Sequence, residues 1–153
     1  MSKVASVLWS ELRRWDFKYA RIIEFDKRNS SFWYMGDIAE DATELVNPRE
    51  RPEFDWPVYG VSNQSGVFLN EFRKGGEFNQ AQKRVREDWF FHNPTRANVG
   101  SIGRVPKVPE NAITSPEYQV WRLKEGAPYC AEFVEIFLQT ELFLEQVQFH
   151  RVG

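Results

Sequence analysis

Short apolar segments, each closed by a glycine or a proline, alternate with polar turns through the middle of the chain, between residues 56 and 118. Apolar runs of this length between turn residues are typical of short β-strands. In the last of them, Tyr118, Val120 and Leu123 alternate with polar neighbours, as on a strand with one buried face. The pattern predicts a turn-rich β unit, with strands expected within 32–39, 57–61, 67–69, 89–92, 97–105 and 113–123. The first is expected to enter a short turn at Gly36-Asp37, and the strand at 97–105 to be broken by Gly100 and Gly103.

Two polar segments interrupt this β unit. Residues 40–55 are acidic and contain Pro48 and Pro52, which favours a surface loop. Residues 71–85 are polar and basic, with a flexible point at Gly75-Gly76. We expect this second segment to be the longest irregular stretch of the unit.

Helical periodicity marks both ends of the chain. Residues 10–14 predict a short helical turn, with Trp9, Leu12 and Trp15 on one apolar face. From Pro128 onward apolar residues recur at helical spacing, which predicts one long helix or two short ones that break near Gln139-Thr140. Strands first and helices last predict the α+β class and not alternating βαβ units. The helical part is expected to place three phenylalanines in the core: Phe133, Phe137 and Phe143.

Size and composition bound the class of protein. A chain of 153 residues is expected to form one domain with a buried core. Aromatic residues make up 16% of it, more than such a core needs, so some are expected at an interface. The single cysteine, Cys130, excludes an internal disulfide, indicates a reducing compartment and is interpreted as a buried helix residue. No apolar run approaches the length of a membrane span, so we expect a soluble, cytoplasmic protein.

Charge is unevenly distributed, although the net charge is only −2. Residues 72–107 contain eight Lys or Arg against three acids, whereas 24–55 and 110–153 together contain sixteen acids against seven bases. A basic segment can bind nucleic acid in a chain of low net charge, because affinity depends on the cations that face the phosphates. Many mixed surfaces show similar segregation, so the asymmetry alone decides nothing.

Catalytic motifs are poorly represented. An amino-methyltransferase needs an aromatic residue after an Asn-Pro-Pro turn to hold the flipped base, and the turn here reads Asn93-Pro94-Thr95-Arg96. The glycine-containing stretch 100–103 precedes a proline-containing loop and not the helix that a phosphate-binding loop requires. His92 and His150 have no second ligand at metal-binding spacing. The sequence therefore predicts a non-catalytic protein without a cofactor or a metal.

Several short sequence motifs of the chain are similar to motifs that occur together in one known family. They are Pro57-Val58-Tyr59-Gly60-Val61-Ser62 with Gly66-Val67, then Phe90-Phe91-His92-Asn93-Pro94 with Asn98-Val99-Gly100-Ser101-Ile102, then Ser115-Pro116-Glu117-Tyr118. The opening Tyr34 to Ala39 and the helical segment Tyr129 to Phe149 fit the same family. In combination, over about residues 30–153, these phrases resemble the target-recognition domain of the specificity subunits of type I restriction-modification systems.

The resemblance implies both a fold and a role. The fold would be that of the DNA methylase specificity domains: an N-terminal helical lead-in (1–29), a β-rich unit (30–125) and a helical hairpin (126–153). Because the long helices that separate two such domains do not follow, we expect a fragment of a two-domain subunit or a natural half-subunit. It would read one half of a bipartite double-stranded DNA target for the methyltransferase (M) and restriction (R) subunits, without catalysing a reaction itself.

In such a domain the basic segment 73–86 would carry the DNA contacts. It supplies the side chains that read guanine (Arg, Lys) and adenine (Asn, Gln) in the major groove. Asn63-Gln64-Ser65 is a second candidate loop, whereas Arg96 and Asn98 are interpreted as scaffold. The candidate DNA-binding residues are Arg73, Lys74, Asn79, Gln80, Gln82, Lys83, Arg84 and Arg86. Within this set the amides are expected at bases, and Lys74, Lys83, Arg84 and Arg86 mostly at phosphates.

Two other classes of function stay open on the sequence alone. A non-catalytic protein-interaction domain, with an aromatic surface and no DNA affinity, also fits the composition. A nuclease or a methyltransferase fits less well, because the motifs for either chemistry are missing. Salt-dependent DNA binding would separate the first two classes, and activity with an added adenosyl cofactor would test the third.

Overall fold

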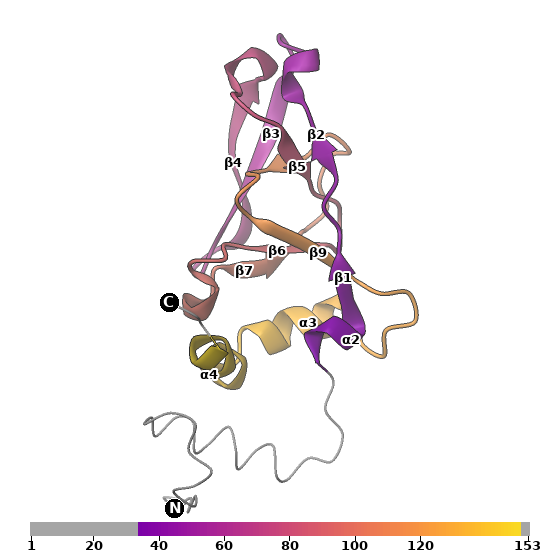
Figure 1. Cartoon of the computed structure of the whole chain (residues 1–153), viewed down its shortest axis with the longest axis vertical. Helices are drawn as coiled ribbons and strands as arrows, with labels where there is room; N and C mark the ends of the chain where they lie inside the picture. The colour runs from indigo at the N-terminus through magenta and orange to yellow at the C-terminus, as the bar shows by residue number, and fades with distance from the viewer. Residues whose placement is uncertain (1–33, 151–153) are drawn as a thin grey trace, which may run out of the picture.

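The computed structural model of the chain describes residues 34–150. The helical turn expected at 10–14, the lead-in 1–29 and the first residues of the strand expected at 32–39 lie outside this range. The described part is α+β, as predicted, with two sheets and a C-terminal pair of helices (Figure 1). Within it, no helix is both long enough and apolar enough to cross a membrane.

The strands form two sheets that follow one another along the length of the molecule (Figure 1). The first sheet is antiparallel and has the order β1 (Ala39–Asp41), β9 (Gln119–Leu123), β6 (Phe90–His92), β7 (Ile102–Arg104). The second has the order β2 (Leu45–Val46), β5 (Gln82–Arg84), β8 (Ile113–Thr114), β3 (Asp55–Ser62), β4 (Gly66–Lys74). In this sheet β3 and β8 run parallel and the other neighbours antiparallel.

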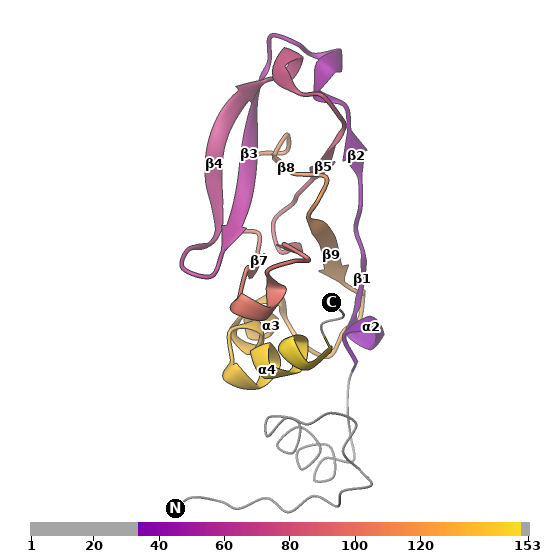
Figure 2. The same ribbon diagram turned by 60° about the vertical axis from the view of Figure 1, so that its left-hand side comes forward.

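Helices and single 3₁₀ turns lie at the two ends of the molecule. The helices α2 (Met35–Ile38), α3 (Ala131–Leu138) and α4 (Glu141–His150) lie at the end of the first sheet. The turns η2 (Pro48–Glu50) and η3 (Gly75–Glu77) lie at the opposite end, while η4 (Ala97–Val99) lies beside α4 (Figures 1 and 2). Of the two arrangements expected for the helical part, the structure has the pair of short helices with the break at Gln139-Thr140.

The β3–β4 hairpin connects the two ends of the molecule (Figure 2). Its turn is closed by Ser62, whose Oγ accepts a hydrogen bond of 3.1 Å from the Ser65 backbone N–H, and by Gly66, whose positive φ of 60° favours glycine. Val58 pairs with Glu71 and Tyr59 with Leu69, so Asn70 forms a bulge between them. The hairpin carries residues 73–75 to the end that η2 occupies.

Three apolar clusters hold these parts together. The first links the two sheets through residues such as Val61 of β3, Phe91 of β6 and Val120 of β9. The second joins the first sheet to the helix pair, and here Phe90 stacks on Trp121 with ring centroids 4.4 Å apart. Adjacent residues Phe90 and Phe91 are thus buried on opposite faces of β6, which explains its continuous apolar run.

The third apolar cluster lies under η2 and η3. It contains Trp56, Val58, Phe78 and Ile113, and Phe54 packs against it. Each of these residues comes from a strand of the second sheet or from the loops that continue those strands. The two turns at this end therefore rest on a packed base.

Arg104 fastens α3 to the first sheet. Its guanidinium donates to Glu135 at 2.8 Å, to Asp88 at 2.7 Å and to Glu132 at 3.3 Å. These carboxylates, Glu135 foremost, raise the pKa of Arg104 above its ordinary value. The helix is thereby held both by its apolar face and by an ion-pair network beside it.

Several expectations about local structure were wrong. Residues 71–85 are not one irregular stretch, because β4 runs to Lys74 and β5 begins at Gln82. The strand expected at 97–105 is broken at Gly100, as predicted, where φ is 85°, but residues 97–99 form η4 instead of a strand and Gly103 lies inside β7. The surface loop expected at 40–55 contains β2 and η2.

Expectations about three parts of the helical segments also differ from the structure. Cys130 is exposed, because its extended backbone places it before the first turn of α3 and outside the helix. The turn expected at Gly36-Asp37 is a helical turn over residues 35–38, in which the Asp37 carboxylate accepts a hydrogen bond of 2.9 Å from the Tyr34 backbone N–H, and β1 begins only at Ala39. Of the phenylalanines expected in the core, Phe143 is buried and Phe137 partly buried, but Phe133 is exposed on the outer side of α3.

Candidate nucleic-acid interface

Two loops meet at the end of the molecule farthest from the helix pair (top of Figure 1), and we call them the apex: residues 47–55, around η2, and residues 73–80, around η3. The Gly76 N–H donates to the Pro52 carbonyl at 2.9 Å, and the Gly75 N–H to the Phe54 carbonyl at 3.0 Å. Lys74 Nζ donates to the Glu53 carbonyl at 3.1 Å. The two loops thus form one backbone-bonded unit.

Gly75 makes the close approach of these loops sterically feasible. A Cβ atom at this position would lie closer than 3.0 Å to the carbonyl oxygens of Pro48 and Arg51, a separation that real Cβ atoms do not show. Any side chain would therefore push η2 and η3 apart. The glycine pair that the sequence marks as a flexible point is a packed contact in the structure.

Four of the eight candidate DNA-binding residues lie on the apex. Arg73 pairs with Glu71 and lies with its guanidinium 5.2 Å from the centroid of the buried Phe78 ring. Lys74 pairs with Asp55 at 3.5 Å. Asn79 and Gln80 are exposed, and their side-chain amides form no hydrogen bond with any residue that the structure describes. Their donors and acceptors face solvent from a rigid support.

The other four candidates belong to β5 and its continuation, where their polar groups are engaged within the protein. Gln82 is buried, and its Nε2 donates to the carbonyls of Gln80 at 3.1 Å and Ala81 at 3.3 Å. Lys83 Nζ donates to the Tyr118 carbonyl at 2.7 Å. These two side chains hold β5 in place, so a base or a phosphate would have to replace existing contacts to reach them.

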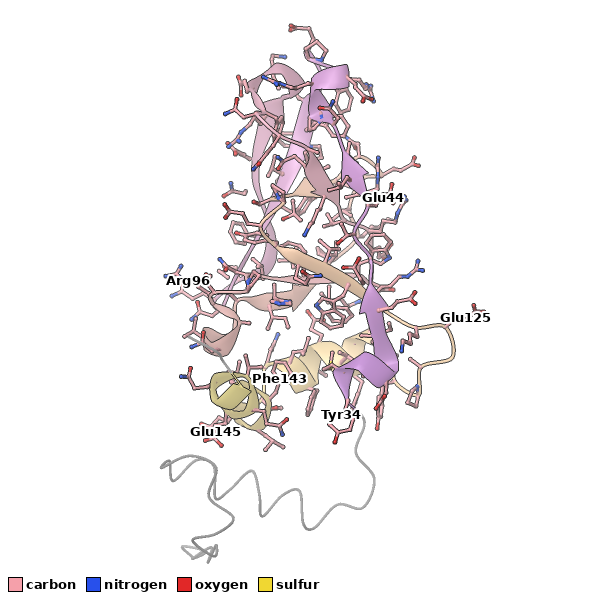
Figure 3. The ribbon with its side chains drawn as sticks, in the orientation of Figure 1. Tyr34, Glu44, Arg96, Glu125, Phe143 and Glu145 are labelled. Carbon is pink, nitrogen blue, oxygen red and sulfur yellow. The ribbon has the colours of Figure 1, made fainter. Side chains whose placement is uncertain are left out.

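Arg84 and Arg86 converge on Glu44, a residue of the opposite loop (labelled in Figure 3). Arg84 Nε lies 2.7 Å from one carboxylate oxygen and Arg86 2.9 Å from the other, and Arg84 also donates to the Glu110 carbonyl. The hydrogen bond from Arg86, with the charges of both arginines, lowers the pKa of Glu44 below its ordinary value. The eight candidates therefore form two sets: an apex set, in which Asn79 and Gln80 are unengaged and Arg73 and Lys74 each pair with a carboxylate, and a β5 set engaged internally.

The structure adds two cations that the sequence did not assign to the interface, Arg49 and Arg51 of the apex. Both are exposed, and the Arg51 guanidinium carbon lies 3.9 Å from the centroid of the Phe54 ring. Their segment is acidic, so charge counting along the chain concealed them. The contact between η2 and η3 that joins the two loops of the apex leaves no local signal in the sequence.

The apex also carries acids, so its charge is balanced. Glu50, Glu53 and Glu77 are exposed there, and none of them pairs with a cation of the described residues. The surface is therefore not a broad positive patch. Contacts with an anion would have to be made locally by individual side chains.

The second candidate loop, 63–65, lies apart from the apex. It forms the turn of the β3–β4 hairpin at the end directed toward the helix pair (Figure 2). There it borders a hollow together with Gly100, Arg104 and Glu135. The two loops expected to read DNA do not form a single surface.

An apolar hollow lies between α2, the first sheet and α4. Its walls include Met35, Trp121 and Phe143, with His92 at its edge. His92 Nδ1 accepts a hydrogen bond of 3.3 Å from Trp121 Nε1. Burial, and to a lesser degree the charge of Lys83, lowers the pKa of His92, which favours the neutral ring.

The described domain has the fold of a specificity subunit of type I restriction-modification systems. The match is to the crystal structure of the HsdS subunit from Thermoanaerobacter tengcongensis, with a TM-score of 0.64 and 18% sequence identity. It covers 78% of this chain and 32% of that one, so the chain spans about a third of that subunit. The match supports the coarser expectation from the sequence, an α+β domain with the fold of a specificity subunit. No protein-family model and no curated protein matches the chain.

Proposed function

We propose that the chain is a target-recognition domain that reads double-stranded DNA through its apex. The observation that carries the proposal is the pair Asn79 and Gln80, which expose unengaged amides from a loop junction locked at Gly75, on a fold shared with a specificity subunit. A rigid support matters because side chains discriminate between base edges only when their direction is fixed.

The apex set would supply the direct contacts of this interface. Asn79 and Gln80 present the donor and acceptor groups that pair with the major-groove edge of adenine. Arg73 and Lys74, each already paired with one carboxylate, would contact the sugar-phosphate backbone beside them. Gln82, Lys83, Arg84 and Arg86 would reach DNA only if their internal hydrogen bonds open.

The proposed partners follow from the class of the fold. The domain, residues 1–153, would be one recognition unit of a longer two-domain subunit or a natural half-subunit. It would specify half of a bipartite site for the methyltransferase and restriction subunits and would itself catalyse no step. On this proposal the protein acts in the cytoplasm, where its DNA target is.

A domain transplant tests the proposal. Residues 20–153 would replace the first recognition domain of a characterised specificity subunit, co-expressed with its methyltransferase, and methylated adenines would be mapped across the host genome. A new half-site joined to the old one is the expected result. An assembled complex that methylates no new site would count against recognition, and the unmodified subunit serves as the control for assembly.

A second candidate function is a protein-interaction domain without DNA affinity. Large apolar side chains are exposed at the helix end of the molecule: Tyr34 is 75% exposed, Phe133 51% and Ile136 67% (Tyr34 is labelled in Figure 3). Large exposed apolar side chains can mark contact surfaces in soluble proteins. Binding of a duplex that weakens with added salt would favour recognition, and its absence would favour the interaction domain.

A further inference from the structure

We infer that Arg49 of η2 and Arg51, which follows η2 directly, bind backbone phosphates of double-stranded DNA and take the role that the sequence assigns to the cations of β5. The inference rests on the proposed function, because it names the phosphate-binding part of the same interface. Three properties of the structure support it: the freedom of these guanidiniums, their orientation, and their linkage to the base-reading loop.

The first property is that the guanidiniums are unengaged. In the part of the chain that the structure describes, four cations have side chains that reach neither a carboxylate nor a carbonyl oxygen: Arg49, Arg51, Arg96 and Lys107. Two of the four lie on the apex. By contrast, Arg84 and Arg86 share Glu44, and Lys83 is bonded to a backbone carbonyl. Phosphate contact by the β5 set would break those bonds, whereas contact by Arg49 and Arg51 breaks none.

The second property is the orientation of Arg51. Its guanidinium carbon lies 3.9 Å from the centroid of the Phe54 ring, and this ring in turn packs edge-on against the buried Trp56 at 5.2 Å. Stacking on an aromatic face restricts a planar guanidinium while leaving its N–H groups free to donate. A side chain that is already ordered loses less conformational entropy when it binds.

The third property is the linkage of η2 to the base-reading loop. Asn47 Oδ1 accepts a hydrogen bond of 3.3 Å from the Arg49 backbone N–H and so caps η2. The carbonyls of Pro48 and Arg51 pack against Gly75, which precedes Asn79 and Gln80 by one short turn. Phosphate contacts on η2 would therefore fix the register in which the two amides meet the bases.

The test uses the salt dependence of binding to a mixed-sequence duplex, because phosphate contacts do not depend on base sequence. The full chain would be compared with the double variant Arg49→Ala/Arg51→Ala. Each lost phosphate contact lowers the slope of log K against log salt by about 0.9, so the slope should become shallower by about 2. The matched control, Arg96→Ala/Lys107→Ala, removes the same charge from the other two unengaged cations and should leave the slope unchanged.

The outcomes separate this inference from the proposed function. If the unsubstituted chain binds the duplex and both double variants keep its slope, the assignment to η2 is overturned while DNA binding stands. If the slope became equally shallow in both double variants, the change would be a general effect of removing charge, and the assignment to η2 would also be overturned. If the unsubstituted chain binds no duplex, the proposed function and the inference fail together.

A further variant tests the orientation of Arg51 separately. Phe54→Leu keeps both charges and an apolar side chain but removes the aromatic face. We expect affinity for the duplex to fall roughly two- to ten-fold with the salt slope retained, because the guanidinium must then be ordered on binding. Unchanged affinity would show that the ring does not position Arg51.

Discussion

Gly75 is the residue on which the contact between η2 and η3 depends, and it can be tested against its neighbour. Gly75→Ala should lower the free energy of unfolding by about 1–3 kcal/mol, because the added Cβ collides with two backbone carbonyls that cannot rotate away. A Cβ at Gly76 would meet only ordinary contacts, 3.6 Å from Pro52. Gly76→Ala is therefore the control, and urea unfolding of the three proteins is the measurement. Equal stability of the two variants would contradict the packing that we describe.

The carboxylate of Glu44 makes a second prediction at the residue scale, and it concerns pH. Because its folded-state pKa lies below the ordinary 4.5, its pairs with Arg84 and Arg86 stabilise the fold above that pH. Their contribution fades as the pH falls through the lower folded-state value. Glu44→Gln should therefore lower the free energy of unfolding by about 1 kcal/mol at pH 7, a modest amount because the side chain is partly exposed.

Urea unfolding at a series of pH values measures this effect. The difference between Glu44→Gln and the unsubstituted chain should narrow as the pH falls below 4.5. Glu87 is exposed and forms no ion pair with the described residues, so Glu87→Gln serves as the control and should match the unsubstituted chain throughout. A constant difference across the pH series would show that Glu44 stabilises the fold by packing and not by its charge.

The sequence predicts those features of the candidate interface that depend on neighbouring residues, and it misses those that depend on partners far away along the chain. Asn79 and Gln80 could be proposed from the sequence because their polarity and their neighbours are local features. The partner of Arg86 is a glutamate 42 positions earlier, and the partner of Lys83 is a carbonyl 35 positions later. Such pairings depend on which strands become neighbours, so a basic segment read alone cannot separate an engaged cation from a free one.

At the scale of elements, the hydrophobic pattern predicts strands whose side chains are buried and misses a strand whose side chains are mostly exposed. β6 and β9 were expected because buried strands carry apolar side chains, which the sequence shows directly. β4 continues to Lys74 but lies at the edge of its sheet, and most of its side chains are exposed. Its second half therefore carries polar residues and was expected to be irregular. β4 is held by its backbone hydrogen bonds to β3, and backbone hydrogen bonds leave no periodic pattern of apolar residues in the sequence.

α3 allows the contribution of a buried helix face to be measured. Leu138 is 1% exposed and packs in the cluster between the helices and the first sheet, whereas Ile136 on the same helix is largely exposed. Leu138→Ala should lower the free energy of unfolding by about 2–5 kcal/mol, the range for a large aliphatic side chain removed from a core. Ile136→Ala should change it by less than about 0.5 kcal/mol. Thermal or urea unfolding compares them, and similar losses would mean that α3 presents a different face.

At the scale of the whole molecule, the fold separates two surfaces by its full length. The apex lies at one end of the second sheet, and the helix pair with its exposed apolar residues lies beyond the first sheet (Figures 1 and 2). The two sheets are joined by a continuous core. Such an arrangement suits the proposed function, in which the apex contacts DNA and leaves the helix end available to protein subunits.

The different roles proposed for the amides and the arginines of the apex predict that sequence preference and affinity can be altered independently. Selection of bound duplexes from a random-sequence library would be carried out with the unsubstituted chain, with Asn79→Ala/Gln80→Ala and with Arg49→Ala/Arg51→Ala. Removing the two amides should reduce discrimination at one or two positions by about 1–3 kcal/mol each, because bidentate contacts to base edges are lost. Removing the two arginines should weaken binding to all sequences alike and leave the selected motif intact. An unchanged motif in the amide variant would move base reading away from the apex, and the hairpin loop 63–65 would be the next segment to substitute.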